Sequence, residues 1–223
     1  MTISPQSEKP PYKTIYCTEA ERPDMVQRIL RFRKDILVDR FGWDLKVVDG
    51  IERDEFDTPD AIHGAILDGQ EIIGCFRLTR TDRPYLAFTK FGHLAQKRPY
   101  PRSPLVWEIS RLAVAESSRP FETMLFSYSA IFNFAISRGA TSLVAFADVA
   151  KERLVKLIGI TTDLMCDPTE IGKDAFGNPI VCVAGELPLR LQKGPKFERL
   201  LSYTAKTEIE DADAIFGRTR ISA

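Results

Sequence analysis

The sequence predicts an α/β fold in which a mixed, partly parallel sheet is covered by helices. Strands and helices alternate after Val106, an order that is typical of parallel strands joined by helical crossovers. An Asp68-Gly69 turn between two apolar segments adds an antiparallel hairpin. The helix expected over 121–138 is apolar nearly all round, so it must lie in the interior of the molecule.

The first half of the chain contains a strand, a helix and a long charged loop before the hairpin. We expect the strand at 13–17 and the helix at 19–39, where apolar residues recur in a helical rhythm. Charges dominate 43–59, and a loop of this length in a compact domain is usually functional or mobile. The hairpin strands follow at 61–67 and 71–78, because Asp-Gly supplies the positive φ angles that a tight turn needs.

The second half of the chain is predicted to continue the sheet with helices between the strands. Ser118 and Pro120 open the central helix and Gly139 closes it. The predicted order is a strand at 105–114, a helix at 121–138, a strand at 142–146, a helix at 149–157, strands near 161–165 and 180–186, and a helix at 196–204.

Length and composition are consistent with a single domain that spans 1–223. The chain has 223 residues, of which 44% are apolar, enough for a substantial core. We expect a flexible leader over 1–11 and a weakly ordered tail over about 207–223. The 31 basic and 31 acidic residues cancel, so no global field attracts nucleic acid or anionic lipid. No segment approaches the ~20 apolar residues of a membrane span.

The cysteines indicate a reducing compartment and no metal site. Cys17, Cys75, Cys166 and Cys182 lie far apart with no C-x-x-C pair. Free thiols in a cytoplasmic protein are therefore the default interpretation. Cys75 is interpreted as a small buried hydrophobe and not as a nucleophile, because no histidine lies near it in the sequence.

The segment from Arg33 to Asp57 is the most informative part of the chain. It combines Trp43 with the carboxylates Glu52, Asp54, Glu55 and Asp57. Like charges this close repel unless a cation or hydrogen-bond donors lie among them. Either the row binds a cationic ligand beside an aromatic ring, or it is a solvated acidic loop.

Glu108 and Arg111 form a second polar pair in an otherwise apolar strand. At positions i and i+3 they point to opposite faces if the strand is regular. Burial raises the pKa of a glutamate toward the range of a general base, whereas a neighbouring arginine lowers it. In the alternative, structural interpretation, each side chain pairs with a different neighbour, for example Arg77 or Arg33. The sequence leaves this choice open.

Four spaced blocks together resemble the acyl-homoserine lactone synthases of the autoinducer synthase family. They are RKDILVDRFGW at 33–43, GIERDEFD at 50–57, GCFRL at 74–78 and VWEISRLAV at 106–114. The resemblance implies an N-acetyltransferase-like three-layer fold with a V-shaped cleft. It also implies transfer of an acyl group from a thioester to the amine of S-adenosylmethionine, followed by lactone closure and release of methylthioadenosine. S-adenosylmethionine is then a substrate, and no cofactor is expected.

The resemblance also implies roles for a set of polar residues. S-adenosylmethionine is cationic, which suits a site made by Trp43, Asp54, Asp57, Arg33 and Arg111. Glu108 is the candidate base, and the arginines hold carboxylates and lock the acidic loop. The implied catalytic set is Glu108, Arg111, Arg33 and Arg77. The chain departs from the family pattern at Leu37, where an aromatic is usual, and at Ala87, where a larger aliphatic is common; Phe32 or Phe41 is a possible substitute for the first.

We expect the acyl chain to lie against the apolar helix and the strand that follows it. Ala145 matches a position that often carries a hydroxyl where the family prefers a 3-oxo group, so we predict an acyl group without that oxygen. The donor is acyl-coenzyme A or acyl carrier protein. The expected acyl pocket is Met124, Leu125, Phe126, Leu143, Ala145 and Phe146. A carrier protein would meet Lys90, Lys97, Arg98, Arg102, Lys151, Arg153 and Lys156.

Two other functions remain open. One is an ordinary N-acyltransferase of the same fold that uses another amine. The loop at 115–121 lacks the glycine-rich turn that such enzymes use to bind pyrophosphate, which disfavours this class. The other is a non-catalytic sensor of S-adenosylmethionine or of an acyl group. Release of methylthioadenosine distinguishes the three, because only the synthase produces it.

Overall fold

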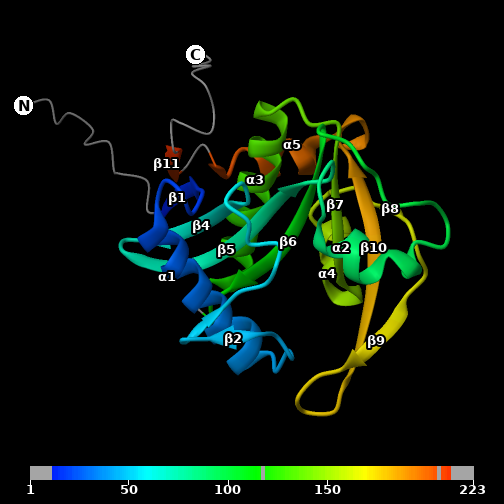
Figure 1. Ribbon diagram of the computed structural model, residues 1–223. Coiled ribbons are helices and arrows are strands. Elements are labelled where there is room, and N and C mark those ends of the chain that lie inside the picture. The colour runs from blue at the N-terminus through cyan, green and yellow to red at the C-terminus, as the bar shows by residue number, and fades with distance from the viewer. Residues whose placement is uncertain (1–11, 117–118, 205–206, 212–223) are drawn as a thin grey trace, which may run out of the picture.

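A nine-stranded mixed sheet forms the centre of the molecule (Figure 1). The computed structural model describes residues 12–116, 119–204 and 207–211. The strand order is β11-β1-β4-β5-β6-β7-β10-β8, and β9 pairs with β10. Most neighbours are antiparallel, but β1 and β11 are parallel, as are β6 and β7. The predicted mixed, partly parallel sheet is therefore confirmed.

Helices and short connections join the strands. Nine strands form the central sheet, and the strands at 47–48 and 51–52 pair with each other in a separate two-stranded sheet. The strands are β1 (Tyr12–Cys17), β2 (Val47–Val48), β3 (Ile51–Glu52), β4 (Ile62–Asp68), β5 (Glu71–Arg80), β6 (Val106–Val114), β7 (Ser142–Asp148), β8 (Asp163–Leu164), β9 (Thr169–Lys173), β10 (Pro179–Pro188) and β11 (Thr207–Asp211). The helices are α1 (Pro23–Arg33), η1 (Lys34–Arg40), α2 (Leu86–Phe91), η2 (Gly92–Leu94), α3 (Pro120–Ser137), α4 (Val149–Leu157), η3 (Leu189–Leu191) and α5 (Pro195–Leu201).

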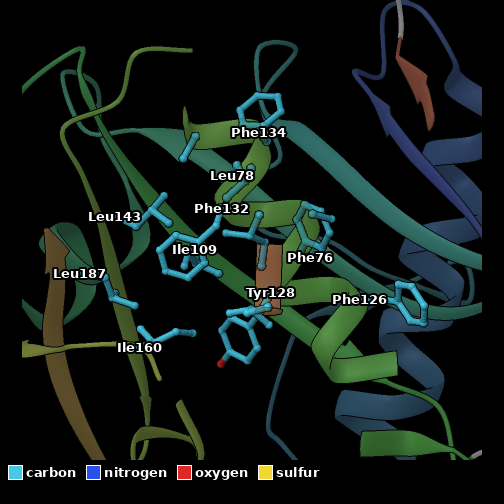
Figure 2. Close-up of a cluster of buried hydrophobic side chains, with 14 of the residues drawn as sticks. Phe76, Leu78, Ile109, Phe126, Tyr128, Phe132, Phe134, Leu143, Ile160 and Leu187 are labelled. Atoms are coloured by element: carbon cyan, nitrogen blue, oxygen red, sulfur yellow. The ribbon is translucent and has the colours of Figure 1, made fainter. Parts of the chain in front are cut away.

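Helices cover both faces of the sheet and divide the core into separate apolar clusters. Helix α3 packs on β4, β5 and β6, with α5 against it. Figure 2 shows this cluster, in which Phe76 and Leu78 of β5 meet Phe132 of α3. Helix α1 packs on the opposite face, where Cys75 of β5 belongs to its cluster. Because successive residues of β5 alternate between the two clusters, this strand is buried on both faces.

Strands β6 and β7 separate after a short parallel contact. Their pairing runs from Val106 with Ser142 to Ile109 with Ala145 and ends there. Beyond this point β6 continues to Val114 along β5, while β7 continues to Asp148 along β10. The sheet therefore opens into a V between its two halves.

Several local predictions are confirmed and several are wrong. The 61–78 hairpin and the central helix are present, and Gly139 follows α3 with a positive φ of 64°. The helix expected over 19–39 begins at Pro23 and ends in the π-helical turn η1. Helix α2 and strand β9 were not predicted. The tail predicted to be weakly ordered from about 207 instead begins with β11, which pairs with β1; the leader 1–11 and residues 212–223 lie outside the described residues.

No helix in the described part of the chain has both the length and the apolar character needed to cross a bilayer.

Candidate active site

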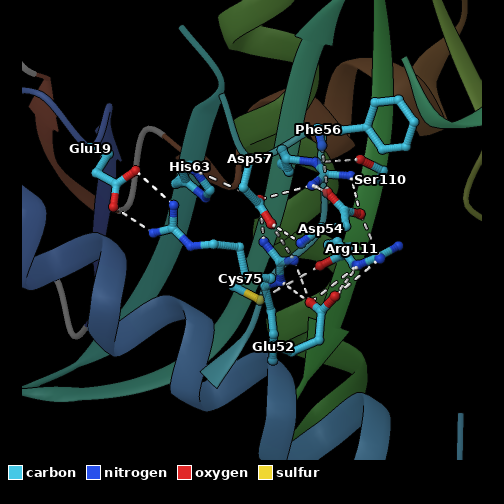
Figure 3. Close-up of polar contacts among 12 residues, drawn as sticks. Glu19, Glu52, Asp54, Phe56, Asp57, His63, Cys75, Ser110 and Arg111 are labelled. Atoms are coloured by element: carbon cyan, nitrogen blue, oxygen red, sulfur yellow. Dashed lines mark hydrogen bonds and ion pairs between the residues drawn. The ribbon is translucent and has the colours of Figure 1, made fainter. Parts of the chain in front are cut away.

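Three arginines and three carboxylates from distant segments form one buried charge network (Figure 3). Arg33 ends α1, Arg77 lies on β5 and Arg111 lies on β6. The carboxylates belong to the acidic segment: Glu52 on β3, then Asp54 and Asp57 in the loop that follows. We call these six residues the charge network.

Arg33 and Arg77 hold the inner side of the charge network. Arg33 donates from Nε to Glu52 at 2.5 Å and from Nη1 and Nη2 to the two oxygens of Asp57 at 2.7 and 3.0 Å. Arg77 donates to Asp54 at 2.5 and 3.1 Å and to Asp57 at 2.8 Å. Its Nε donates to Ser110 at 3.0 Å. Both arginine side chains are almost fully buried.

Arg111 forms the outer side of the charge network. Its Nη2 donates to Asp54 at 2.7 Å and to Glu52 at 3.1 Å. The loop is also held by its own main chain, since the N–H of Asp54 donates to Asp57 at 2.9 Å and that of Phe56 donates to Asp54 at 2.9 Å. Three positive and three negative side chains thus neutralise one another.

This pairing changes the interpretation of the acidic segment. Burial opposes ionisation of Asp57, but the guanidinium groups of Arg33 and Arg77 outweigh it and hold the pKa of Asp57 below its usual range. Burial likewise opposes ionisation of Asp54, and Arg77 with Arg111 lowers its pKa. The repulsion among the carboxylates is therefore relieved by the arginines of the protein itself, as the locking role predicted for them requires.

A β-bulge directs Arg111 toward the charge network. Cys75 pairs with Ala113 and Arg77 with Ser110, so β6 has one residue more than β5 between these pairs. Arg111 occupies the bulge with a φ of 54°, a conformation that is uncommon for any residue other than glycine. The strand is therefore not regular, and both Ser110 and Arg111 reach the charge network.

A cavity of about 700 Å³ fills the V between β6 and β7. Ser110, Arg111 and Asp54 line it on the side of the charge network. The other predicted members Arg33, Arg77 and Asp57 do not line it, although Asp57 was predicted to face the ligand. They lie behind Asp54 and Arg111 and support them.

Trp43 lines the cavity, and its neighbour Gly42 contacts the turn between β9 and β10. The Lys151 ammonium lies 5.4 Å from the Trp43 ring centre. Beside it, the N–H of Ala175, in the turn between β9 and β10, donates to the carbonyl of Gly42 at 2.9 Å. A β-carbon on Gly42 would lie 3.0 Å from both Ala175 and Phe176, and Gly42 has a φ of 67°, so glycine is required there.

Glu108 lies beside the cavity but does not line it. Its carboxylate accepts from the N–H of Leu86 at 3.1 Å and of Ala87 at 2.7 Å, at the start of α2. Leu86 and Ile109, its neighbours, do line the cavity. Burial raises the pKa of Glu108 to about 7, so burial outweighs the arginines. Ala87 is buried and supplies a main-chain donor to this carboxylate.

Two of the six side chains predicted for the acyl pocket line the cavity. Ala145 and Phe146 line the cavity, and Phe146 stacks on Phe91 of α2 with ring centres 4.1 Å apart. The other four side chains pack in or against the core cluster of α3, which corrects the prediction for Met124, Leu125, Phe126 and Leu143. Tyr128, one turn further along α3, is the residue of that helix that lines the cavity. Because α3 has no polar face, its sequence does not show which of its side chains line the cavity and which pack in the core.

Most of the predicted carrier-binding basic residues are paired within the chain. Five of the seven form ion pairs: Lys90 with Glu55, Lys97 with Asp167, Arg98 with Asp163 and Glu186, Lys151 with Asp148, and Lys156 with Glu152.

The two departures from the family pattern, Leu37 and Ala87, are both buried, and Leu37 packs in the α1 cluster away from the cavity wall. All four cysteines are buried free thiols.

The family model for autoinducer synthases matches residues 17–177. The chain belongs to the autoinducer synthase family. An acyl-homoserine-lactone synthase from Aeromonas salmonicida is 31% identical over 148 residues, which cover 64% of this chain and 72% of that protein. The family predicted from the four sequence blocks is therefore confirmed.

Solved structures share the fold of this chain. The structure of a CoA-dependent acyl-homoserine lactone synthase, BjaI, with SAM and isopentyl-CoA has a TM-score of 0.78 and 22% identity, and the match covers 92% of this chain and 97% of that one. A putative N-acetyltransferase from Lactobacillus plantarum has a TM-score of 0.50 and 17% identity, covering 79% and 98%. The predicted N-acetyltransferase-like fold is confirmed.

Proposed function

We propose that this autoinducer synthase transfers an acyl group from a thioester to the amine of S-adenosylmethionine and closes the lactone. The observation that carries the proposal is the cavity in the V of the sheet, which has charged and aromatic groups at one end and apolar walls beyond them. One substrate of this reaction is cationic and the other carries an apolar chain. The two parts of the cavity suit these two substrates.

S-adenosylmethionine occupies the end formed by Trp43, Asp54 and Arg111. Its sulfonium and ammonium groups suit the face of the Trp43 ring and the carboxylate of Asp54, and Arg111 suits its carboxylate. Arg33, Arg77 and Asp57 act through these residues, because their ion pairs fix the positions of Asp54 and Arg111. They are positioning residues in this proposal.

Glu108 accepts the proton of the attacking amine. An α-amine has a pKa near ~8 in water, and a neighbouring carboxylate raises it, so the amine needs a base. The pKa of Glu108, about 7, lies near the operating pH, as a general base requires. Because Glu108 lies behind Leu86, the proton travels through one water molecule.

Main-chain groups stabilise the oxyanion, and lactone closure follows. The amine attacks the thioester carbonyl, and main-chain N–H groups of the opened strands donate to the oxygen that becomes negative. The carrier thiol leaves. The carboxylate of the methionine part then attacks its own γ-carbon, which forms a five-membered ring and expels neutral methylthioadenosine. S-adenosylmethionine is a substrate in this reaction, and the proposal includes no cofactor.

The acyl donor is a thioester of coenzyme A or of acyl carrier protein, and the acyl group lacks a 3-oxo oxygen because Ala145 has no donor for it. The four buried free thiols fit a cytoplasmic enzyme.

The test is to incubate the purified protein with S-adenosylmethionine and acyl thioesters on both carriers, and to measure the products by mass spectrometry. Acyl-homoserine lactone and methylthioadenosine should appear together. An acylated amine without methylthioadenosine would instead indicate an N-acyltransferase. Binding of S-adenosylmethionine without turnover of any thioester would indicate a sensor.

A further inference from the structure

The cavity extends through the opening between β6 and β7 to the side of the sheet that α3 covers. Its wall there is made by Ile109, Ala145, Val155, Leu187 and Tyr128, which lie in or against the core cluster of α3. We call this part the inner chamber. The first four side chains are aliphatic, and Tyr128 adds a polar atom to them. Burial, and to a smaller extent the Asp148 carboxylate that also lines the cavity, raise the pKa of Tyr128, so its hydroxyl stays protonated.

Tyr128 is buried, and its hydroxyl lacks a hydrogen-bond partner among the residues that the structure describes. The residue is 5% exposed and lines the cavity. Among residues 12–116, 119–204 and 207–211, none forms a hydrogen bond with this hydroxyl. In Figure 2 the hydroxyl points away from Phe76 and Phe132. The equally buried Tyr16 and Tyr85 donate to the carbonyls of Ala130 and Pro101 at 2.9 and 2.8 Å.

An unpaired hydroxyl makes the inner chamber selective for the chemistry of its occupant. A plain alkyl chain would displace water from Tyr128 without replacing its hydrogen bond, and an unpaired buried polar group is costly. An acyl group with an oxygen at this point would replace that bond. Without the Tyr128 hydroxyl, the aliphatic side chains would offer this oxygen no hydrogen-bond donor, and its burial would be unfavourable.

The reacting end of the acyl group lies on the other side of the sheet. Asp54 and Arg111 mark the S-adenosylmethionine end, on the face covered by α1. Tyr128 belongs to α3 on the opposite face, so it meets the part of the acyl group that is remote from the thioester.

We infer that Tyr128 selects an acyl group with a hydroxyl or carbonyl oxygen on its distal part over a plain alkyl group of the same length. This inference rests on the proposed function. The inner chamber would accordingly bind acyl groups that carry an oxygen on their distal part.

The test compares matched thioesters on one carrier: hexanoyl, 6-hydroxyhexanoyl and 5-oxohexanoyl. Release of methylthioadenosine gives kcat/KM for each. The wild-type protein should favour at least one oxygenated thioester by about tenfold, which is the size expected for one hydrogen bond. Tyr128→Phe should reduce this preference to near one.

Tyr16→Phe is the matched control. It also removes one buried hydroxyl from the same apolar cluster, but Tyr16 does not line the cavity, so the preference should be unchanged. Preference of the wild type for hexanoyl, or a preference that persists in Tyr128→Phe, would overturn the inference and leave the synthase activity intact. Absence of methylthioadenosine with every thioester would refute the proposed function itself, and the inference with it.

Discussion

The Nη2 atom of Arg111 lies 2.7 Å from a carboxylate oxygen of Asp54, and these two residues bring the charge network to the cavity wall. Arg77 shares the same carboxylate from behind. A ligand that contacts Asp54 therefore meets a group whose position and ionisation are already fixed. Such preorganisation lowers the cost of binding, because little reorganisation is needed when the ligand arrives.

Replacement of Asp57 should destabilise the protein. Asp57→Asn keeps the shape but leaves Arg33 and Arg77 with an uncompensated buried charge, which typically costs about 3–5 kcal/mol. Urea denaturation measures the change. The control is Asp60→Asn, which removes an exposed pair with Arg83 and should cost less than about 1 kcal/mol. Equal losses in the two variants would contradict a structural role for the charge network.

The charge network should also make the protein sensitive to acid. Asp54 and Asp57 have lowered pKa values in the folded state, so their contribution to stability is present above the unfolded value near ~3.9. It is lost as the pH falls through their folded values. The free energy of unfolding of the wild type should therefore drop below about pH 4, and Asp57→Asn should show a shallower drop.

Glu108→Gln should remove one ionisation from the pH profile of the reaction. The kcat/KM of the wild type should rise with pH through about 7, because the carboxylate must lose its proton to act as a base. The kcat/KM of the variant should be lower by roughly 10²–10⁴-fold and should lack this rise near pH 7. The rise caused by deprotonation of the substrate amine should remain. A variant that is slow but keeps the rise near pH 7 would show that Glu108 positions α2 through Leu86 and Ala87 and does not take the proton.

Loss of the Trp43 ring should weaken binding of S-adenosylmethionine. Trp43→Ala should raise the Kd by about tenfold, in line with a cation–π contact that is partly desolvated. Calorimetric titration measures it. Trp107 is the control, because the chain has two tryptophans and Trp107 packs on Phe134 away from the cavity wall. Trp107→Phe should leave the Kd unchanged, and a similar loss in both variants would argue against a specific contact.

A hydroxyl at position 145 should change the response to a 3-oxo group. Ala145 lines the cavity, and Ala145→Thr adds a donor there. The relative kcat/KM for a 3-oxo thioester over its plain counterpart should rise by about tenfold. Met124→Leu should not alter this ratio, since Met124 packs against the core cluster of α3. Equal use of the 3-oxo thioester by the wild type would refute the prediction.

Local chemistry made much of the fold predictable. Asp68-Gly69 specified the hairpin and Gly139 the end of α3, because these residues meet steric requirements that depend on a few neighbours. The six-residue helix α2 was missed, since Glu108, far away in the sequence, accepts from its first N–H groups. The edge strand β11 was missed because its hydrogen bonds come from β1.

The polar site was better predicted than the apolar one. Carboxylates and arginines are costly to bury without a partner of opposite charge, so burial of Asp54, Arg77 and Arg111 requires that they form ion pairs. The bulge at Arg111 depends on the register of β5 and β6, which no local pattern shows. The choice among Met124, Phe126 and Tyr128 depended on which way an apolar helix is rotated, and its composition does not reveal that rotation.

The separation of β6 from β7 has a consequence for how this enzyme can be altered. After Ile109 and Ala145 the two strands no longer bond to each other, so peptide groups along the V face the cavity. If these amides stabilise the oxyanion, alanine scanning will not detect them, because every substitution leaves the backbone N–H in place. Only an exchange of an amide for an ester would remove such a donor. In that case part of the catalytic apparatus follows from the topology of the sheet and is insensitive to side-chain mutation.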